Sequence, residues 1–208
     1  MRFSTIAMLF AATVLGAPTE SVFASGSIMR GEIDQGDGFY LATLNNETGI
    51  YDVKFTPLTD LEARAPVGDI TPVNRGNLRK RATTCSGRRS INLGNLDEAN
   101  RRLAQNAHNQ GWYEKNAHGW VDLEGETSFF CNYQGNFLTY QLIIDMHTVV
   151  SHYCGQDGYG YDRRTNGGGA NDLVVGRTWR GDSGCRQKAV GSGWFDRREL
   201  ENMVCTMI

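Results

Sequence analysis

Residues 111–133 read GWYEKNAHGWVDLEGETSFFCNY, and this stretch decides the expected fold. Residues 120–123 and 127–133 are rich in aromatic and aliphatic side chains, and Gly125 lies between these two runs. Runs of this composition on either side of a glycine turn are typical of paired β-strands. The centre of the fold is therefore expected to be an antiparallel sheet.

A helix is expected before these strands. Asn95 is a good N-cap, Glu98 stands where it can close a capping box, and Gly111 ends the pattern. Between them, apolar residues recur at helical spacing, namely Leu96, Ala99, Leu103 and Ala107. The pattern predicts an amphipathic helix that begins at Asn95.

A second helix and a last strand are expected after the paired strands. Residues 137–153 carry a broad apolar face, and Asn136 is the expected N-cap. A glycine-rich loop follows, and residues 172–180 then place apolar side chains on alternating positions, as a strand does. These elements predict an α+β fold, a small antiparallel sheet with two helices packed on one face. A short third helix is expected at 196–205.

The N-terminus has the order of a secretory signal peptide. Arg2 precedes an apolar stretch that is too short to span a bilayer, and small and polar residues follow it. Cleavage after Ala24 or after Gly16 fits the small-residue rule, and we take residues 1–24 as the signal peptide. The alternative is a buried N-terminal helix. The chain is thus expected to be secreted and extracellular.

A second processing site is expected at Lys80 and Arg81, a paired basic site of the kind that secretory proteases cut. The five cysteines all follow it, at Cys85, Cys131, Cys154, Cys185 and Cys205. Cleavage after Arg81 would make residues 25–81 a pro-segment, with 82–185 as the main domain and 186–208 as a C-terminal extension that carries the short helix. In an exported chain these cysteines predict disulfides, and their odd number leaves one over.

The expected pro-segment contains a β-hairpin followed by a linker. Residues 40–44 and 50–55 alternate large apolar with smaller or polar side chains, around a turn rich in asparagine. Asn46 begins an N-glycosylation sequon at the tip of this hairpin. Residues 61–81 have the composition of a flexible linker. In the alternative interpretation the basic pair stays uncut, and the hairpin and the C-terminal part form one domain.

Charge gives no support for some classes of partner. The chain carries 21 Lys and Arg against 23 Asp and Glu, a formal net charge of -2. This balance offers no electrostatic basis for binding nucleic acid or an anionic membrane. His147 and His152 are five residues apart on one expected helix, so they diverge around it and cannot share a metal ion. We expect no catalytic residue, no cofactor and no metal site.

Two other functions remain open from the residues alone. Trp112, Tyr113 and Trp120 lie close together in the sequence and are either core residues or a platform that stacks on sugars. The second interpretation would make the chain a secreted cell-wall carbohydrate-binding module. A small secreted ribonuclease would need a base and groups that bind phosphate. Residues of these types are present at Glu114, His118, Arg163 and Arg164.

Several features between Cys85 and Cys185 follow one another in a recognisable order. Cys-Ser-Gly at 85–87 precedes a helix rich in Arg and Ala, and Cys131 precedes the second helix, which ends in Cys-Gly at 154–155. A glycine-rich loop with Asn-Asp then leads into a strand rich in valine. In this order, over about half of its length, the chain resembles the killer-protein-4-like family of secreted fungal toxins. It is similar, more distantly, to a family of necrosis-inducing fungal effectors.

The resemblance implies how the cysteines pair. Carried over to this chain, the family pairing is Cys85–Cys154 and Cys131–Cys185, and Cys205 lies beyond the match and stays unpaired. Members of the family usually have more cysteines, and some lack a long pro-segment.

The resemblance also implies a secreted antagonistic role. The expected function is that of a non-enzymatic toxin or effector, which acts on a competing microbe or a host cell after removal of the pro-segment. Its expected partners are a membrane protein or a cell-wall glycan of the target cell and a dibasic secretory protease. The toxin of the family is thought to interfere with calcium channels through a basic surface residue. Lys115 is the lysine in the corresponding region; we do not assign it that role, but we keep it as a candidate binding residue.

Overall fold

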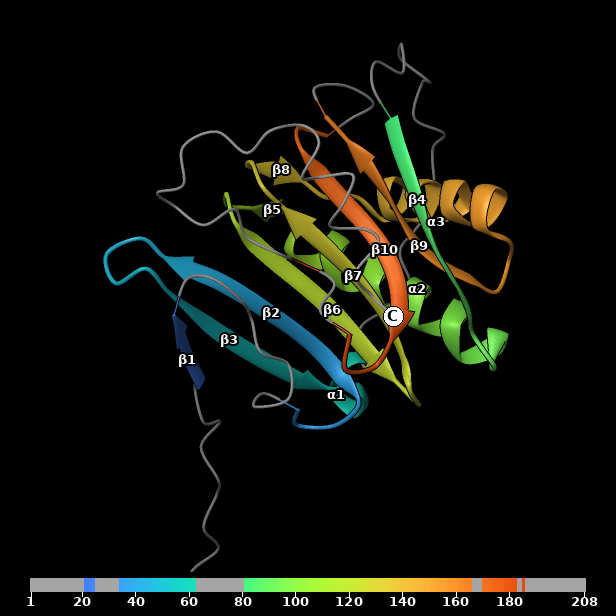
Figure 1. Cartoon of the computed structure of the whole chain (residues 1–208). Coiled ribbons are helices and arrows are strands. Elements are labelled where there is room, and N and C mark those ends of the chain that lie inside the picture. The colour runs from blue at the N-terminus through green and yellow to red at the C-terminus, as the bar shows by residue number, and fades with distance from the viewer. Residues whose placement is uncertain (1–20, 25–33, 63–80, 166–169, 183–184, 186–208) are drawn as a thin grey trace, which may run out of the picture.

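The computed structural model describes residues 21–24, 34–62, 81–165, 170–182 and 185. Eight strands form one sheet in the order β1-β3-β2-β6-β7-β10-β9-β4, and all neighbours are antiparallel (Figure 1). The strands are β1 (Ser21–Ala24), β2 (Gly38–Asn45), β3 (Ile50–Pro57), β4 (Arg81–Arg89), β6 (Ala117–Leu123), β7 (Glu126–Asn132), β9 (Gly158–Arg164) and β10 (Leu173–Trp179). The expected antiparallel sheet is confirmed, and it is larger than expected.

Three helices and a two-stranded ribbon accompany this sheet in the described part of the chain. The helices are α1 (Leu58–Glu62), α2 (Leu93–Gln110) and α3 (Tyr140–Cys154), and the ribbon pairs β5 (Trp112–Tyr113) with β8 (Asn136–Phe137). Helix α2 packs against β6, β7 and α3, and α3 also contacts β4, β9 and β10. None of the described helices is long and apolar enough to cross a membrane.

Two hydrophobic clusters follow the alternation of side chains along the strands. Successive side chains of a strand point to opposite faces of its sheet. Val121 and Phe130 belong to a cluster that also contains buried residues of α2 and α3. Trp120 and Phe129, their neighbours in the same two strands, belong to a second cluster whose described members come from strands and their connections. Both faces of the sheet therefore carry buried apolar side chains.

The two long helices begin at other N-caps than expected. Asn92 caps α2, and its side-chain oxygen accepts a hydrogen bond from the backbone N–H of Asn95, which lies inside the helix. Glu98 closes no capping box, because its carboxylate binds two arginines of the same helix. Thr139 caps α3, whereas Asn136 lies in β8. The expected N-caps at Asn95 and Asn136 are therefore wrong, although both helices exist.

Strand β9 lies where the sequence suggested a glycine-rich loop. It pairs with β4 on one side and β10 on the other. Gly160 stands opposite Cys85, and a Cβ added to this glycine would come within 2.4 Å of the Thr84 carbonyl oxygen and 2.9 Å of Cys154 Sγ. Glycine is needed here because the strand passes a disulfide closely, so a residue typical of loops stands inside a strand.

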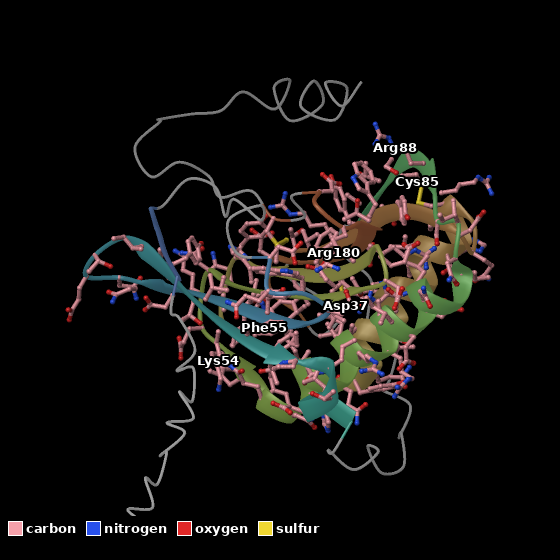
Figure 2. All side chains as sticks on the ribbon, turned by 90° about the horizontal axis from the view of Figure 1, so that it is seen from below. Asp37, Lys54, Phe55, Cys85, Arg88 and Arg180 are labelled. Carbon is pink, nitrogen blue, oxygen red and sulfur yellow. A yellow bond between two sulfur atoms is a disulfide. The ribbon has the colours of Figure 1, made fainter. Side chains whose placement is uncertain are left out.

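The hairpin of the expected pro-segment is present as β2 and β3, and it belongs to the main sheet. Strand β2 lies between β3 and β6, with Gly38 opposite Asp122 and Ala42 opposite His118. Arg180, which follows β10, forms ion pairs with Asp34 and Asp37 in the segment before β2 (Figure 2). Segments on both sides of the expected cut after residue 81 therefore share one sheet.

Part of the expected signal peptide and all of the expected C-terminal extension lie outside the described residues. Strand β1 pairs with β3 and lies inside the expected signal peptide. Cleavage after Ala24 would remove β1, whereas cleavage after Gly16 would keep it. The third helix expected at 196–205 and the leftover Cys205 lie outside the described residues.

Two disulfides stabilise the fold. One joins Cys85 of β4 to Cys154 at the end of α3, and the other joins Cys131 of β7 to Cys185. These are the two pairs that the family resemblance implies. The strand register places the side chain of Cys85 on the face that carries Val175, and that of Cys131 on the opposite face. An antiparallel sheet with helices, stabilised by disulfides, is thus confirmed.

Candidate binding site

Of the three candidate aromatic rings, the structure exposes Trp112 and buries the other two. The exposed fraction of Trp112 is 51%, against 1% for Tyr113 and 3% for Trp120. Trp120 stacks on Tyr40, with ring centroids 5.0 Å apart. For Tyr113 and Trp120 the structure therefore fits the alternative in which these rings are core residues. Lys115 is exposed just after β5.

A different pair of aromatic rings is exposed on the β5–β8 ribbon. Trp112 and Phe137 stand directly opposite each other in its register, so their side chains lie on the same face. The exposed fraction of Phe137 is 57%. Phe137 was not predicted as a binding residue, because the apolar pattern of 137–153 placed it in the second helix rather than in β8. The sequence does contain a pattern that could have indicated this pair, since each of the two rings follows closely after a glycine.

Glycine backbone supports one side of each ring. A Cβ added to Gly135 would come within 2.7 Å of the Trp112 indole, and one added to Gly111 within 2.9 Å of the Phe137 ring. The indole Nε1 of Trp112 donates a hydrogen bond to Glu114 Oε1 at 2.9 Å. The two rings are therefore held in place, and about half of each side chain stays open to solvent. We call Trp112 and Phe137 the aromatic pair.

A polar cavity lies beside the aromatic pair. It has a volume of about 480 Å³, and its lining residues are Gln134, Gly135, Thr165, Asn171 and Asp172. Gly135 connects the two features, because it lines the cavity and also lies under the Trp112 ring. Side-chain amides, a hydroxyl and a carboxylate are thus gathered next to an exposed aromatic surface.

Buried Asn136 fixes the wall of this cavity. Its side-chain amide donates to the backbone carbonyl of Asn171 at 2.7 Å, and its oxygen accepts from the backbone N–H of Asn171 at 2.6 Å. The next residue, Asp172, has a backbone φ of 44°, in the left-handed region that Asp tolerates better than most residues. Its carboxylate accepts hydrogen bonds from Arg163. The cavity wall is therefore held by specific hydrogen bonds before any ligand arrives.

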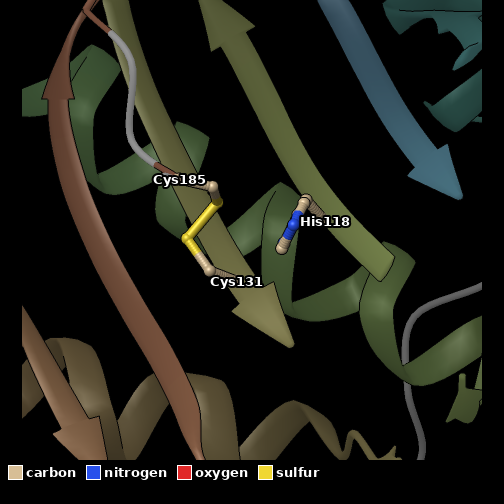
Figure 3. A group of neighbouring side chains, drawn as sticks. All are labelled: His118, Cys131 and Cys185. Carbon is tan, nitrogen blue, oxygen red and sulfur yellow. A yellow bond between two sulfur atoms is a disulfide. The ribbon is translucent and has the colours of Figure 1, made fainter. Parts of the chain in front are cut away.

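His118 lies beside a disulfide, as Figure 3 shows. The ligand atoms of His118, Cys131 and Cys185 lie within 4.8 Å of one another. The two sulfurs are bonded to each other, so neither is a thiolate that could hold a metal ion in this state. His118 Nε2 is 3.2 Å from the hydroxyl oxygen of Tyr51, and burial lowers the pKa of His118 to about 4. This histidine is a neutral core residue near pH 7.

The residues considered for a ribonuclease do not converge. Arg163 and Arg164 are consecutive in β9, so their side chains point to opposite faces of the sheet. Arg164 is buried and pairs with Asp162 of its own strand. Glu114 lies outside the sheet, where it accepts the indole hydrogen bond. The four residue types are present, but the described geometry gives them no shared site.

The two expected modification sites lie at exposed or edge positions. Arg81 is the first residue of the edge strand β4, and Ala82 stands opposite Arg163 of β9. Cleavage after Arg81 would therefore cut inside a paired strand. Asn46 is exposed in the turn between β2 and β3. Its sequon is accessible there, and Lys80 lies outside the described residues.

No family model, curated protein or solved structure matches the chain.

Proposed function

We propose that the chain is a secreted toxin-like or effector-like protein that acts on other cells by binding rather than by catalysis. Cleavage after Arg81 would produce the active form, and the target would be a membrane protein or a cell-wall glycan of a competing microbe or a host cell. The observation that carries this proposal is the pair of disulfides on opposite faces of one sheet. Such crosslinks suit a small protein that must persist outside the cell.

Further parts of the organisation belong to this proposal. Residues 1–24 serve as the signal peptide, and 82–185 form the toxin-like domain with 186–208 as its extension, while β2 and β3 of the pro-segment contribute strands to the sheet of this domain. Helices α2 and α3 cover one face of the sheet, an inference supported by their common hydrophobic cluster with alternate strand residues. Asn46 carries a glycan at an exposed hairpin tip.

Purified secreted protein tests this function directly. We expect growth inhibition of sensitive microbial cells or death of host cells, with no substrate turned over. The protein with both disulfides reduced serves as the control and should lose the effect. Intact secreted protein without effect on a broad panel of microbial and host cells would contradict the proposal.

A carbohydrate-binding module is the second candidate, and the aromatic pair beside a polar cavity favours it. A secreted ribonuclease is the third, and no described geometry favours it. Incubation of the purified protein with RNA separates this third candidate from the others, since intact RNA removes it.

A further inference from the structure

We infer that the aromatic pair, Trp112 and Phe137, together with the polar cavity beside it, binds a neutral polysaccharide built of pyranose units. The inference rests on the proposed function in one respect, that the protein works by binding at a cell surface. It adds the chemical class of the ligand and a site that shares only Trp112 with the three rings considered from sequence.

The rings offer what the apolar face of a pyranose needs. Trp112 and Phe137 stand opposite each other on one face of the β5–β8 ribbon, with 51% and 57% of their side chains exposed. Two exposed aromatic rings side by side form an apolar surface, and covering such a surface contributes free energy to a contact. Each ring lies close against glycine backbone, where a larger residue would place its Cβ within 3 Å of the ring.

The cavity offers what sugar hydroxyls need. Gln134 and Asn171 carry amides that both donate and accept hydrogen bonds, and Thr165 carries a hydroxyl that does the same. The carboxylate of Asp172 accepts hydrogen bonds and is already paired with Arg163.

The charges at the site favour a neutral ligand. The arginine partner offsets the charge of Asp172, and the remaining side chains that line the cavity are uncharged. Glu114 lies next to the aromatic pair through its hydrogen bond with the indole of Trp112. Lys115 follows Glu114 and is also exposed, so these two neighbouring charges are opposite in sign. Such a balance favours neither a polyanionic nor a polycationic ligand, and a polymer of glucose or N-acetylglucosamine meets no net repulsion.

The site is built before it binds. Asn136 holds Asn171 through both its amide nitrogen and its oxygen, and Glu114 holds the Trp112 ring. A site whose groups are already ordered loses less conformational entropy on binding. A weak contact with each sugar unit then suffices, because repeated units of a polymer raise the effective concentration.

Retention on insoluble chitin and insoluble β-1,3-glucan tests the inference with the full secreted protein. We expect one of the two polymers to retain it, and its soluble oligosaccharides to release it. Trp112→Ala and Phe137→Ala should each weaken binding about tenfold, as the loss of one stacked ring does. Trp112→Phe should keep most of the binding. Gly135→Ala should weaken it as well, because the new Cβ displaces the indole.

Tyr153→Ala is the matched control, because Tyr153 is an aromatic residue on α3 with 68% exposure and lies outside the site. It should bind like the unchanged protein, and cooperative unfolding of each variant shows that the fold is intact. Failure of both polymers to retain the protein would overturn the inference, as would equal losses in Tyr153→Ala and Trp112→Ala. Glycan binding without any effect on cells would instead overturn the proposed function and leave this site standing.

Discussion

The contact between His147 and Ser128 joins α3 to the sheet through buried polar atoms. His147 Nε2 is 3.0 Å from the hydroxyl oxygen of Ser128 on β7, and the histidine is buried. Burial, with a smaller contribution from the positive charge of Arg177, lowers the pKa of His147 to about 3. The pKa of His118 falls to about 4 through burial. Both imidazoles therefore stay neutral at a pH where an exposed histidine is already protonated.

We predict that the protein loses stability as the pH falls below about 6.5, the pKa of histidine in an unfolded chain. Below that pH the unfolded chain binds protons that the two buried histidines exclude in the native state, so unfolding becomes more favourable. Their contribution is full above pH 6.5 and is lost as the pH falls toward their native pKa values. At pH 5 the loss is about 2 kcal/mol for each histidine. Urea denaturation at pH 7 and pH 5 measures it.

The double variant Ser128→Ala/His147→Leu provides the control for this pH dependence. It removes both partners of the contact, so no buried polar atom of that pair is left without a partner. About half of the decrease in unfolding free energy that we assign to the two histidines between pH 7 and pH 5 should disappear. The same fall in stability between pH 7 and pH 5 in this variant would show that His147 does not set it.

At the scale of the elements, the two disulfides crosslink strands and a helix that are far apart in the sequence. Cys85–Cys154 closes a sequence separation of 69 residues and ties the edge strand β4 to α3. Cys131–Cys185 closes a separation of 54 and ties β7 to the segment after β10. Each crosslink restricts the unfolded chain more than the folded one.

We predict that Cys85→Ser/Cys154→Ser and Cys131→Ser/Cys185→Ser each lower the free energy of unfolding by about 4 kcal/mol, the value that loops of this length give in the chain-entropy model. Cys205→Ser should change it little, since the resemblance leaves this cysteine unpaired. Guanidinium denaturation of secreted protein gives the values, and mass spectrometry without reduction shows which pairs form. An equal decrease in unfolding free energy in all three cysteine variants would refute the pairing.

Strand β4 also controls access to the basic pair. A protease binds its substrate in an extended form, so the residues around Arg81 and Ala82 must leave β9 before they can be cut. We predict that Cys85→Ser/Cys154→Ser is cut after Arg81 several-fold faster than the unchanged protein, because the start of β4 is then less firmly held. The variant that lacks Cys131–Cys185 is the control. Limited proteolysis with a dibasic-specific protease, followed by N-terminal sequencing, measures both rates.

Local pattern was enough to predict some elements and not others. The hairpins β2–β3 and β6–β7 were expected because their strands carry alternating or continuous apolar side chains. Such patterns are typical of strands buried on one face or on both faces. Strand β9 was missed because its sequence, GYGYDRR, is rich in glycine and charge. Its place depends on a disulfide that passes Gly160 and on the pairing of the strand with β4 and β10, all of which are contacts between parts distant in the sequence. The aromatic pair was not predicted for a similar reason: β5 and β8 are short and lie apart in the sequence, so only the fold brings the two rings together.

At the scale of the whole molecule, the hairpin β2–β3 is embedded in the sheet rather than attached to its surface. Phe39 and Leu41 of β2 pack in the cluster that contains the helices, whereas Tyr40 and Ala42 pack in the cluster on the other face. Burial of such side chains on two strands contributes on the order of 10 kcal/mol. The ion pairs of Arg180 with two aspartates add a contact at the end of β10.

We predict that the hairpin stays bound after cleavage at Arg81. The cut protein should elute from a size-exclusion column as one complex of two chains, and denaturant should separate them. A recognition sequence for a site-specific protease, inserted between residues 63 and 80, makes the cut independent of the basic pair. Arg180→Gln should lower the denaturant concentration needed for separation by a small amount, because ion pairs that stay partly open to solvent contribute little. A hairpin that leaves the column separately in native buffer would contradict the prediction.

The position of β2 also determines how the chain can reach its fold. Strand β2 must find β6 across a long stretch of chain, with residue 38 opposite residue 122, and such distant pairings slow folding. In the uncut chain this search is intramolecular and independent of concentration. After a cut it becomes an encounter between two molecules, which dilution outside the cell makes rare. A cut protein that unfolds would therefore not refold, and its working lifetime would depend on how slowly it unfolds.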